Sequence, residues 1–191
     1  KISQNFLTAA AFNEGLHFFI EDTYYENHNS RVNGFLYLGL DNFGSEINKL
    51  KENGFLRRDF KEYAISYAIN EKGEDVKSGD FENFNYAVEA FVGYLSERRA
   101  DFLNFVRSRG YNAKKLSEDQ IDYWTYFSHN CGKNCMRDRI REKGIQVPKN
   151  PGKIRTNDPV DNALGVLATK DLIDRAGLFE KRISEDIALH K

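Results

Sequence analysis

The sequence feature that most constrains the fold is a long apolar stripe at helical spacing in the middle of the chain. Its members recur three, four or seven positions apart: Phe84, Val88, Phe91, Leu95, Phe102 and Val106. This spacing places apolar side chains on one face of a helix. The helix is expected to begin near residues 80–83 and to end before Gly110. The chain is therefore predicted to contain one long central helix.

Start and stop signals divide most of the remaining chain into further helices. Ser117 with Gln120 has the pattern of a capping box, and Asp158 followed by Pro159 has that of a cap and first turn. Together with the apolar spacing, such signals predict helices over residues 3–19, 45–53, 59–68, 117–132, 134–143 and 158–177. A charged loop with a glycine is expected over residues 70–79.

One region of the sequence favours β structure. Residues 22–33 are polar and rich in turn-forming asparagine, and the apolar run Phe35–Leu40 follows them as a short predicted strand. We therefore expect a mainly α, lysozyme-like α+β fold, in which a small β-hairpin lobe near residues 22–41 packs against a helical lobe. No repeat or low-complexity linker interrupts the 191 residues, so one domain is predicted, with the small lobe at about 14–70 and the helical lobe at about 80–180.

The balance of charges argues against nucleic acid as a partner. The 28 basic and 29 acidic residues give a net charge of -1, and 40% of the residues are hydrophobic, which is typical of a globular domain. The local exception is the basic run Arg137, Arg139, Arg141 and Lys143, which is interpreted either as a solvated helix face or as a lip for an anionic polymer. No stretch is apolar for the roughly 20 residues of a membrane span, and we expect a soluble monomer.

Cys131 and Cys135 are four residues apart with Gly132 between them. On an unbroken helix this spacing does not favour a bridge, although a turn at Gly132 would permit one, so buried or partly buried thiols are the preferred interpretation. A zinc site with His129 lacks a fourth ligand at a familiar spacing. No metal or cofactor is expected.

Glu14 is the strongest candidate for chemistry. Glycoside cleavage needs a carboxylic acid kept protonated by partly apolar surroundings, together with a second group or a water near the reacting sugar carbon. Glu14 lies late in the first predicted helix, close in sequence to Phe12 and Phe18. Glu21, Asp22 and Glu26 follow it as candidates for the second role.

The order of these motifs resembles the phage-type muramidases of the lysozyme-like superfamily. The segments on which the resemblance depends are Glu14-Gly15-Leu16, Asp22-Thr23, the strand Tyr37 to Asp41, and Tyr126 to Gly132 near the end of a later helix. The resemblance implies cleavage of the bond between N-acetylmuramic acid and N-acetylglucosamine in bacterial peptidoglycan. Glu14 would be the general acid, and Asp22 would stabilise positive charge or position water. The aspartate comes one residue early, and Tyr37 stands where the family has a threonine.

A second alignment, to lytic transglycosylases and goose-type lysozymes, makes Glu21 the acid and requires no second carboxylate. In either case Tyr25, Tyr37, His129 and Asn130 are candidates for binding substrate. The side chains that could line a sugar cleft are Trp124 and the tyrosines Tyr24, Tyr25, Tyr37, Tyr123 and Tyr126. Core packing is the alternative for Trp124 and Phe127. The expected location is the bacterial cell wall, reached by secretion or delivery, with a phage origin or a larger parent protein compatible with the sequence.

The rival function is a lysozyme-like interaction module without activity. The tyrosine at position 37, where the family has a threonine, favours the module over the enzyme. A Glu14 that faces an open cleft would favour the enzyme, whereas a buried Glu14 held in a salt bridge would favour the module.

Overall fold

The computed structural model describes residues 1–16, 48–58, 68–69, 75–76, 84–149 and 158–177. The elements it defines are α1 (Gln4–Ala11), a π-helical turn (Phe12–Leu16), β1 (Ala68–Ile69), β2 (Asp75–Val76), α6 (Phe84–Ser108), a 3-10 turn (Ala113–Lys115), α7 (Glu118–Cys131), α8 (Lys133–Lys143) and α9 (Pro159–Ala176). The described part is mainly helical, as the sequence predicts. None of its helices is long and apolar enough to cross a membrane.

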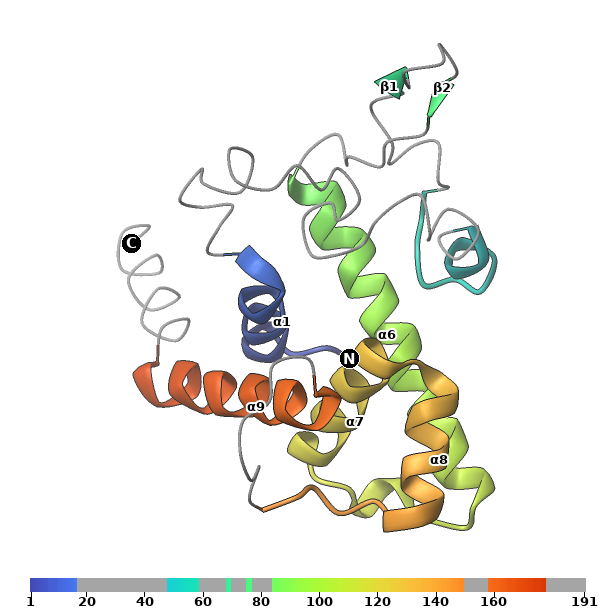
Figure 1. The fold of residues 1–191 in the computed structure, drawn as a ribbon, viewed down its shortest axis with the longest axis vertical. Helices are drawn as coiled ribbons and strands as arrows, with labels where there is room; N and C mark the ends of the chain where they lie inside the picture. The colour runs from blue at the N-terminus through green and yellow to red at the C-terminus, as the bar shows by residue number, and fades with distance from the viewer. Residues whose placement is uncertain (17–47, 59–67, 70–74, 77–83, 150–157, 178–191) are drawn as a thin grey trace, which may run out of the picture.

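The long helix is α6, which confirms the prediction from the apolar stripe. Figure 1 shows α6 running down the described part, with α7 and α8 against its lower half. Helix α9 packs on α7, and α1 packs on α9. The N-terminal helix is thereby brought beside α7, although more than 100 residues separate them in the sequence.

The predicted helix starts are confirmed by their hydrogen bonds. Ser117 and Gln120 form a reciprocal capping box at the start of α7. Asp158 accepts a hydrogen bond from the backbone of Val160 at the start of α9, and Ser3 caps α1. These side chains satisfy backbone N–H groups that have no partner within the helix, which is why short polar residues fix helix starts so reliably.

The β structure differs from the prediction. Ala68 pairs with Val76 and Ile69 with Asp75 in an antiparallel register. The expectation that a helix continues to Ala68 is therefore wrong at that residue, and the loop expected over residues 70–79 is wrong at Asp75 and Val76, which form β2. The predicted strand Phe35–Leu40 and the hairpin lobe near 22–41 lie outside the described residues.

The core lies between α1, α6, α7 and α9. Its largest fully buried side chains come from α1, α6, α7 and α8: Trp124, Tyr123, Tyr126, Phe6, Phe91, Phe102, Leu95, Met136 and Val106. Trp124 stacks on Phe102 and donates its indole N–H to the backbone oxygen of Ile145 at 3.0 Å. Core packing is thus the role of Trp124, one of the two roles considered for it.

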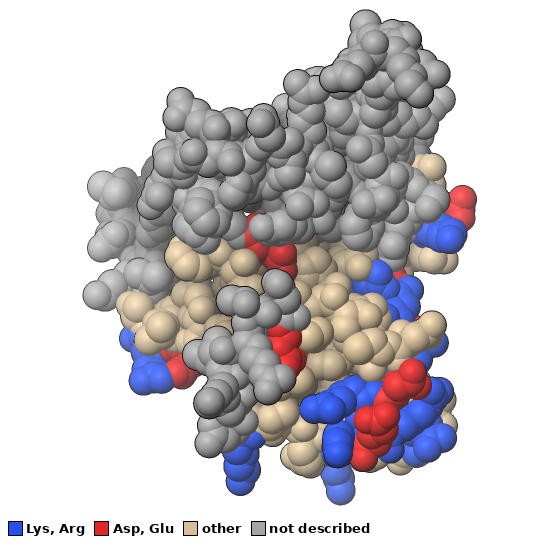
Figure 2. Space-filling view, viewed as in Figure 1, with Lys and Arg blue, Asp and Glu red and all other residues tan. Residues whose placement is uncertain are grey.

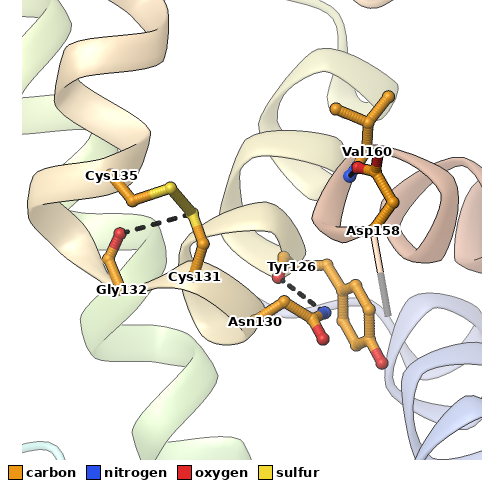
Figure 3. Close-up of a disulfide and its surroundings, with 7 residues drawn as sticks. All are labelled: Tyr126, Asn130, Cys131, Gly132, Cys135, Asp158 and Val160. Carbon is orange, nitrogen blue, oxygen red and sulfur yellow. Dashed lines mark hydrogen bonds between the residues drawn. A yellow bond between two sulfur atoms is a disulfide. The ribbon is translucent and has the colours of Figure 1, made fainter. Parts of the chain in front are cut away.

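Cys131 and Cys135 form a disulfide, so the preferred interpretation of free thiols is wrong. Gly132 separates α7 from α8 with a positive φ of 85°, a backbone conformation that favours glycine. The break brings the two cysteine Cα atoms to 5.7 Å, within bridging range. Figure 3 shows the bridge across this turn.

A buried ion network joins α6, α7 and α9. Asp122 has a side chain only 2% exposed, and its two oxygens meet Arg99 at 3.1 Å and Lys170 at 2.9 Å. The same two cations reach outward to Glu118 and Asp119 at the start of α7. Removing one partner from such a buried network leaves charge uncompensated, so Asp122 links the three helices.

We expect the fold to lose stability at alkaline pH. Burial raises the pKa of Tyr123 to about 12, and burial with the neighbouring Glu14 carboxylate raises the pKa of Tyr126. Burial by itself lowers the pKa of Lys170, but Asp119 and Asp122 raise it overall above 10.5. Each group binds its proton more tightly in the folded state, so its stabilisation is complete below about pH 10 and is lost as the pH rises through the folded-state values.

Urea unfolding followed by circular dichroism at about pH 7, 8.5 and 11.5 measures this loss. The free energy of unfolding should hold nearly constant from the first to the second and fall at the third. Equal free energies of unfolding at all three pH values would contradict the raised pKa values of Tyr123, Tyr126 and Lys170.

Candidate active site

Glu14 lies in the π-helical turn that follows α1. Such wider turns are rare and occur frequently at functional sites. The turn directs Glu14 toward α7, and the residue is only 8% exposed. A carboxyl at this depth needs hydrogen-bond donors from the protein.

Both described donors to Glu14 come from one face of α7. The Tyr126 hydroxyl donates to Oε1 of Glu14, and Nε2 of His129 lies 2.9 Å from the same oxygen. Tyr126 and His129 are three residues apart, which places them side by side on a helix. Asn13 donates to the Tyr126 hydroxyl oxygen at 2.6 Å, so that a chain of hydrogen bonds runs from Asn13 through Tyr126 to Glu14.

Aromatic rings enclose the His129 imidazole. The rings of Phe91 and Tyr94 meet it edge to face at 5.6 and 5.5 Å between centroids, and the Tyr126 ring lies tilted at 5.3 Å. The side chain of His129 is 9% exposed, and its Nδ1 is buried without a hydrogen-bond partner among the described residues. The group that meets Glu14 is therefore held in surroundings that are largely apolar.

The other predicted site residues fall into two sets. Glu21, Asp22, Tyr25 and Tyr37 lie outside the described residues, and so does Glu26. Asn130 is exposed; its amide donates to the backbone oxygen of Tyr126 at 3.3 Å, as Figure 3 shows, and it accepts from Asn162. Substrate binding by His129 and Asn130 stays a prediction.

Two tyrosines considered for a sugar cleft are buried instead. Tyr123 is 1% and Tyr126 0% exposed, so neither ring offers a face to a ligand. The role of Tyr126 as a donor to Glu14 was not predicted. The i, i+3 spacing of Tyr126 and His129 was the available signal, because it places their two polar tips side by side on one face of the predicted helix.

Two pockets lined by described residues lie elsewhere. One of about 460 Å³ opens between α8 and the start of α9 near Cys135, and another of about 340 Å³ lies beside Tyr111. Within the described ranges, no group of three or more His, Cys, Asp or Glu side chains is placed to hold a metal ion. Glu14 with its two α7 partners is thus the best-defined polar site of the described part.

Comparison with known proteins leaves the resemblance to muramidases as a prediction. No family model, no curated protein and no solved structure matches the chain.

Proposed function

We propose that the chain is a glycosidase that cleaves the bond between N-acetylmuramic acid and N-acetylglucosamine in bacterial peptidoglycan, with Glu14 as the general acid. The observation that supports it is the chemistry of the groups that meet Glu14: a phenol and an imidazole lie at its carboxyl, and no described arginine or lysine does. A general acid of this kind has to hold a proton and release it to the leaving sugar oxygen.

The partners of Glu14 differ from those of the other buried carboxylates. Asp122 meets Arg99 and Lys170, and Glu97 meets Lys133. Arginine and lysine are cations at neutral pH and favour the ionised form of a carboxylate, although burial outweighs them at Asp122 and raises the pKa of its carboxyl group. A phenol and an imidazole can both donate hydrogen bonds while neutral, so they leave room for a proton on the carboxyl group. This contrast favours an acid at Glu14 over a structural ion pair.

The hydrogen bonds also indicate which oxygen would carry the proton. Both α7 donors meet Oε1, and no described side chain meets Oε2. With Nε2 of His129 as the donor, Oε1 accepts in both contacts, and the proton of the acid form then belongs on Oε2. In the proposed reaction Oε2 protonates the glycosidic oxygen, while Tyr126 and His129 stabilise the carboxylate that remains.

The remaining parts of the reaction follow from the resemblance. Asp22 would stabilise the developing positive charge or position the attacking water, in a cleft between the small lobe and the helical lobe. The substrate would be the glycan strands of the cell wall, which the protein would reach by secretion or delivery. No cofactor enters this reaction.

A second candidate is the lysozyme-like module without activity. The low exposure of Glu14 and its contact with His129 favour it, because these meet the criterion given above for a structural carboxyl. A third, closely related candidate is a lytic transglycosylase with Glu21 as its acid.

One digestion experiment separates the three. Purified peptidoglycan is treated with the wild type, Glu14→Gln and Glu21→Gln, and the released muropeptides are analysed by mass. Reducing-end products lost only with Glu14→Gln support the muramidase, and anhydro products lost with Glu21→Gln support the transglycosylase. No release by folded wild type, across several wall types, supports the module.

His129 is expected to assist Glu14 by hydrogen bonding alone. His129→Phe keeps the aromatic surroundings filled but removes the donor, and loss of one charge-assisted hydrogen bond should lower kcat by about 10- to 100-fold with little change in KM. His129→Gln, which can restore an N–H donor, should recover part of the rate. Initial rates of muropeptide release measure both; a wild-type rate in His129→Phe would remove His129 from the reaction.

A further inference from the structure

Four cations gather where α6 connects to α7. Arg107, Arg109, Lys114 and Lys115, called here the 107–115 patch, are all exposed. The sequence from Phe102 to Ser117 contains no aspartate or glutamate. The patch is therefore a local concentration of positive charge in a chain whose net charge is only -1.

The patch differs in its charge partners from the basic run on α8, for which a lip for an anionic polymer is one of the two interpretations. On and beside that run, Lys133 pairs with Glu97, Arg137 with Asp101 and Arg141 with Asp138. In Figure 2 blue and red side chains intermingle at the lower right, where Figure 1 places α8. Much of the charge on α8 is therefore already neutralised by carboxylates.

No described carboxylate neutralises the patch. Arg107 meets only the neutral amide of Asn104, at 3.0 Å, among the described side chains. The nearest acidic residues along the chain, Glu118 and Asp119, are engaged by Arg99 and Lys170. The positive charge of the patch thus remains available to an outside anion.

A pocket of about 340 Å³ adjoins these cations. Its lining combines the apolar side chains of Leu103, Ala113 and Ile121 with Arg107, Lys114, Tyr111 and Asn112. Tyr111 is 39% exposed and is one of three large hydrophobic side chains that are exposed among the described residues. An exposed ring beside cations suits a ligand that alternates carbon-rich units with anionic groups.

We propose that the 107–115 patch binds a linear polymer with repeated phosphate groups on sugar or polyol units, of the kind attached to bacterial cell walls. Phosphates meet the cations, and a sugar or polyol unit packs on Tyr111 in the pocket. Tyr94, beside His129, is thirteen residues before Arg107 on α6. The patch therefore lies roughly 20 Å along the helix from the Glu14 site, and it anchors the protein without contributing to cleavage.

The proposal depends on the proposed function only for its cell-wall setting. A binding experiment can therefore test it without measuring cleavage. The full chain is sedimented with purified cell walls that carry their phosphate polymer and with the same walls stripped of it by hydrofluoric acid. The wild type should bind intact walls at least about tenfold more tightly than stripped ones, and Lys114→Gln/Lys115→Gln should lose about tenfold.

The matched control is Lys143→Gln/Lys149→Gln, which removes the same charge from exposed positions elsewhere and should bind as the wild type. Equal binding to stripped walls, equal loss in both double variants, or tighter binding to DNA or to anionic lipid vesicles would overturn the proposal. Glu14→Gln should bind normally. Muropeptide release without wall binding would defeat this inference alone, whereas binding without release would defeat only the proposed function.

Discussion

Replacing Glu14 with glutamine is expected to lower the rate of muropeptide release by about 10²- to 10⁴-fold, the usual contribution of a general acid. Glutamine has the same shape, and its amide oxygen can still accept from Tyr126 and His129. It cannot give up a proton as a carboxylic acid does. The loss should therefore appear in kcat rather than in substrate binding or in stability.

Glu142→Gln is the matched control, because Glu142 is an exposed carboxylate on α8. It should cleave peptidoglycan at the wild-type rate. Thermal unfolding of both variants verifies that the protein remains folded. Full activity in a folded Glu14→Gln would exclude Glu14 as the acid and direct attention to Glu21.

Replacing Asp122 with alanine is expected to lower the free energy of unfolding by about 3 kcal/mol, near the lower end of the range for breaking a buried charge pair. The change removes the carboxylate that joins Arg99 of α6 to Lys170 of α9. The value lies at the low end because each cation keeps a second carboxylate: Arg99 still meets Glu118, and Lys170 still meets Asp119. Urea unfolding followed by circular dichroism measures the loss.

Asp138→Ala provides the comparison for this variant. Asp138 pairs with Arg141 on one exposed face of α8, with side chains 63% and 51% exposed, so its loss should cost less than about 1 kcal/mol. If the two variants were equally stable, the Asp122 network would not hold the three helices together.

Local signals account for the part of the fold that was predicted. The capping box at Ser117, the Asp158 cap and the apolar stripe of α6 each depend on residues within a few positions of one another. Side-chain caps and helical spacing act through short-range geometry, so they can be recognised without knowledge of the partner surfaces.

Long-range contacts account for the part that was missed. Glu14 meets Tyr126 and His129 only because α9 packs on both α1 and α7 and so brings α1 beside α7, and nothing near Glu14 in the sequence specifies that packing. The disulfide was missed for a related reason. Four-residue spacing alone does not favour a bridge on a helix, and the bridge forms because the chain breaks at Gly132.

The structure also adds what the sequence leaves open about the basic run on α8, which is interpreted either as a solvated helix face or as a lip for an anionic polymer. The run that begins at Arg137 is the denser cluster of basic residues, but α6 supplies Glu97 and Asp101 opposite it. Whether a cation is neutralised depends on the facing helix, which the sequence of its own helix does not reveal. The 107–115 patch, which has no described carboxylate partner, is the better candidate for an anionic ligand.

The most direct test of the central claim is the release of muropeptides from purified peptidoglycan by the folded wild-type chain, with Glu14→Gln in parallel. We expect reducing-end muropeptides from the wild type and a loss of at least about 100-fold in the variant. Release at equal rates by both, or no release by folded wild type from any of several wall types, would contradict it.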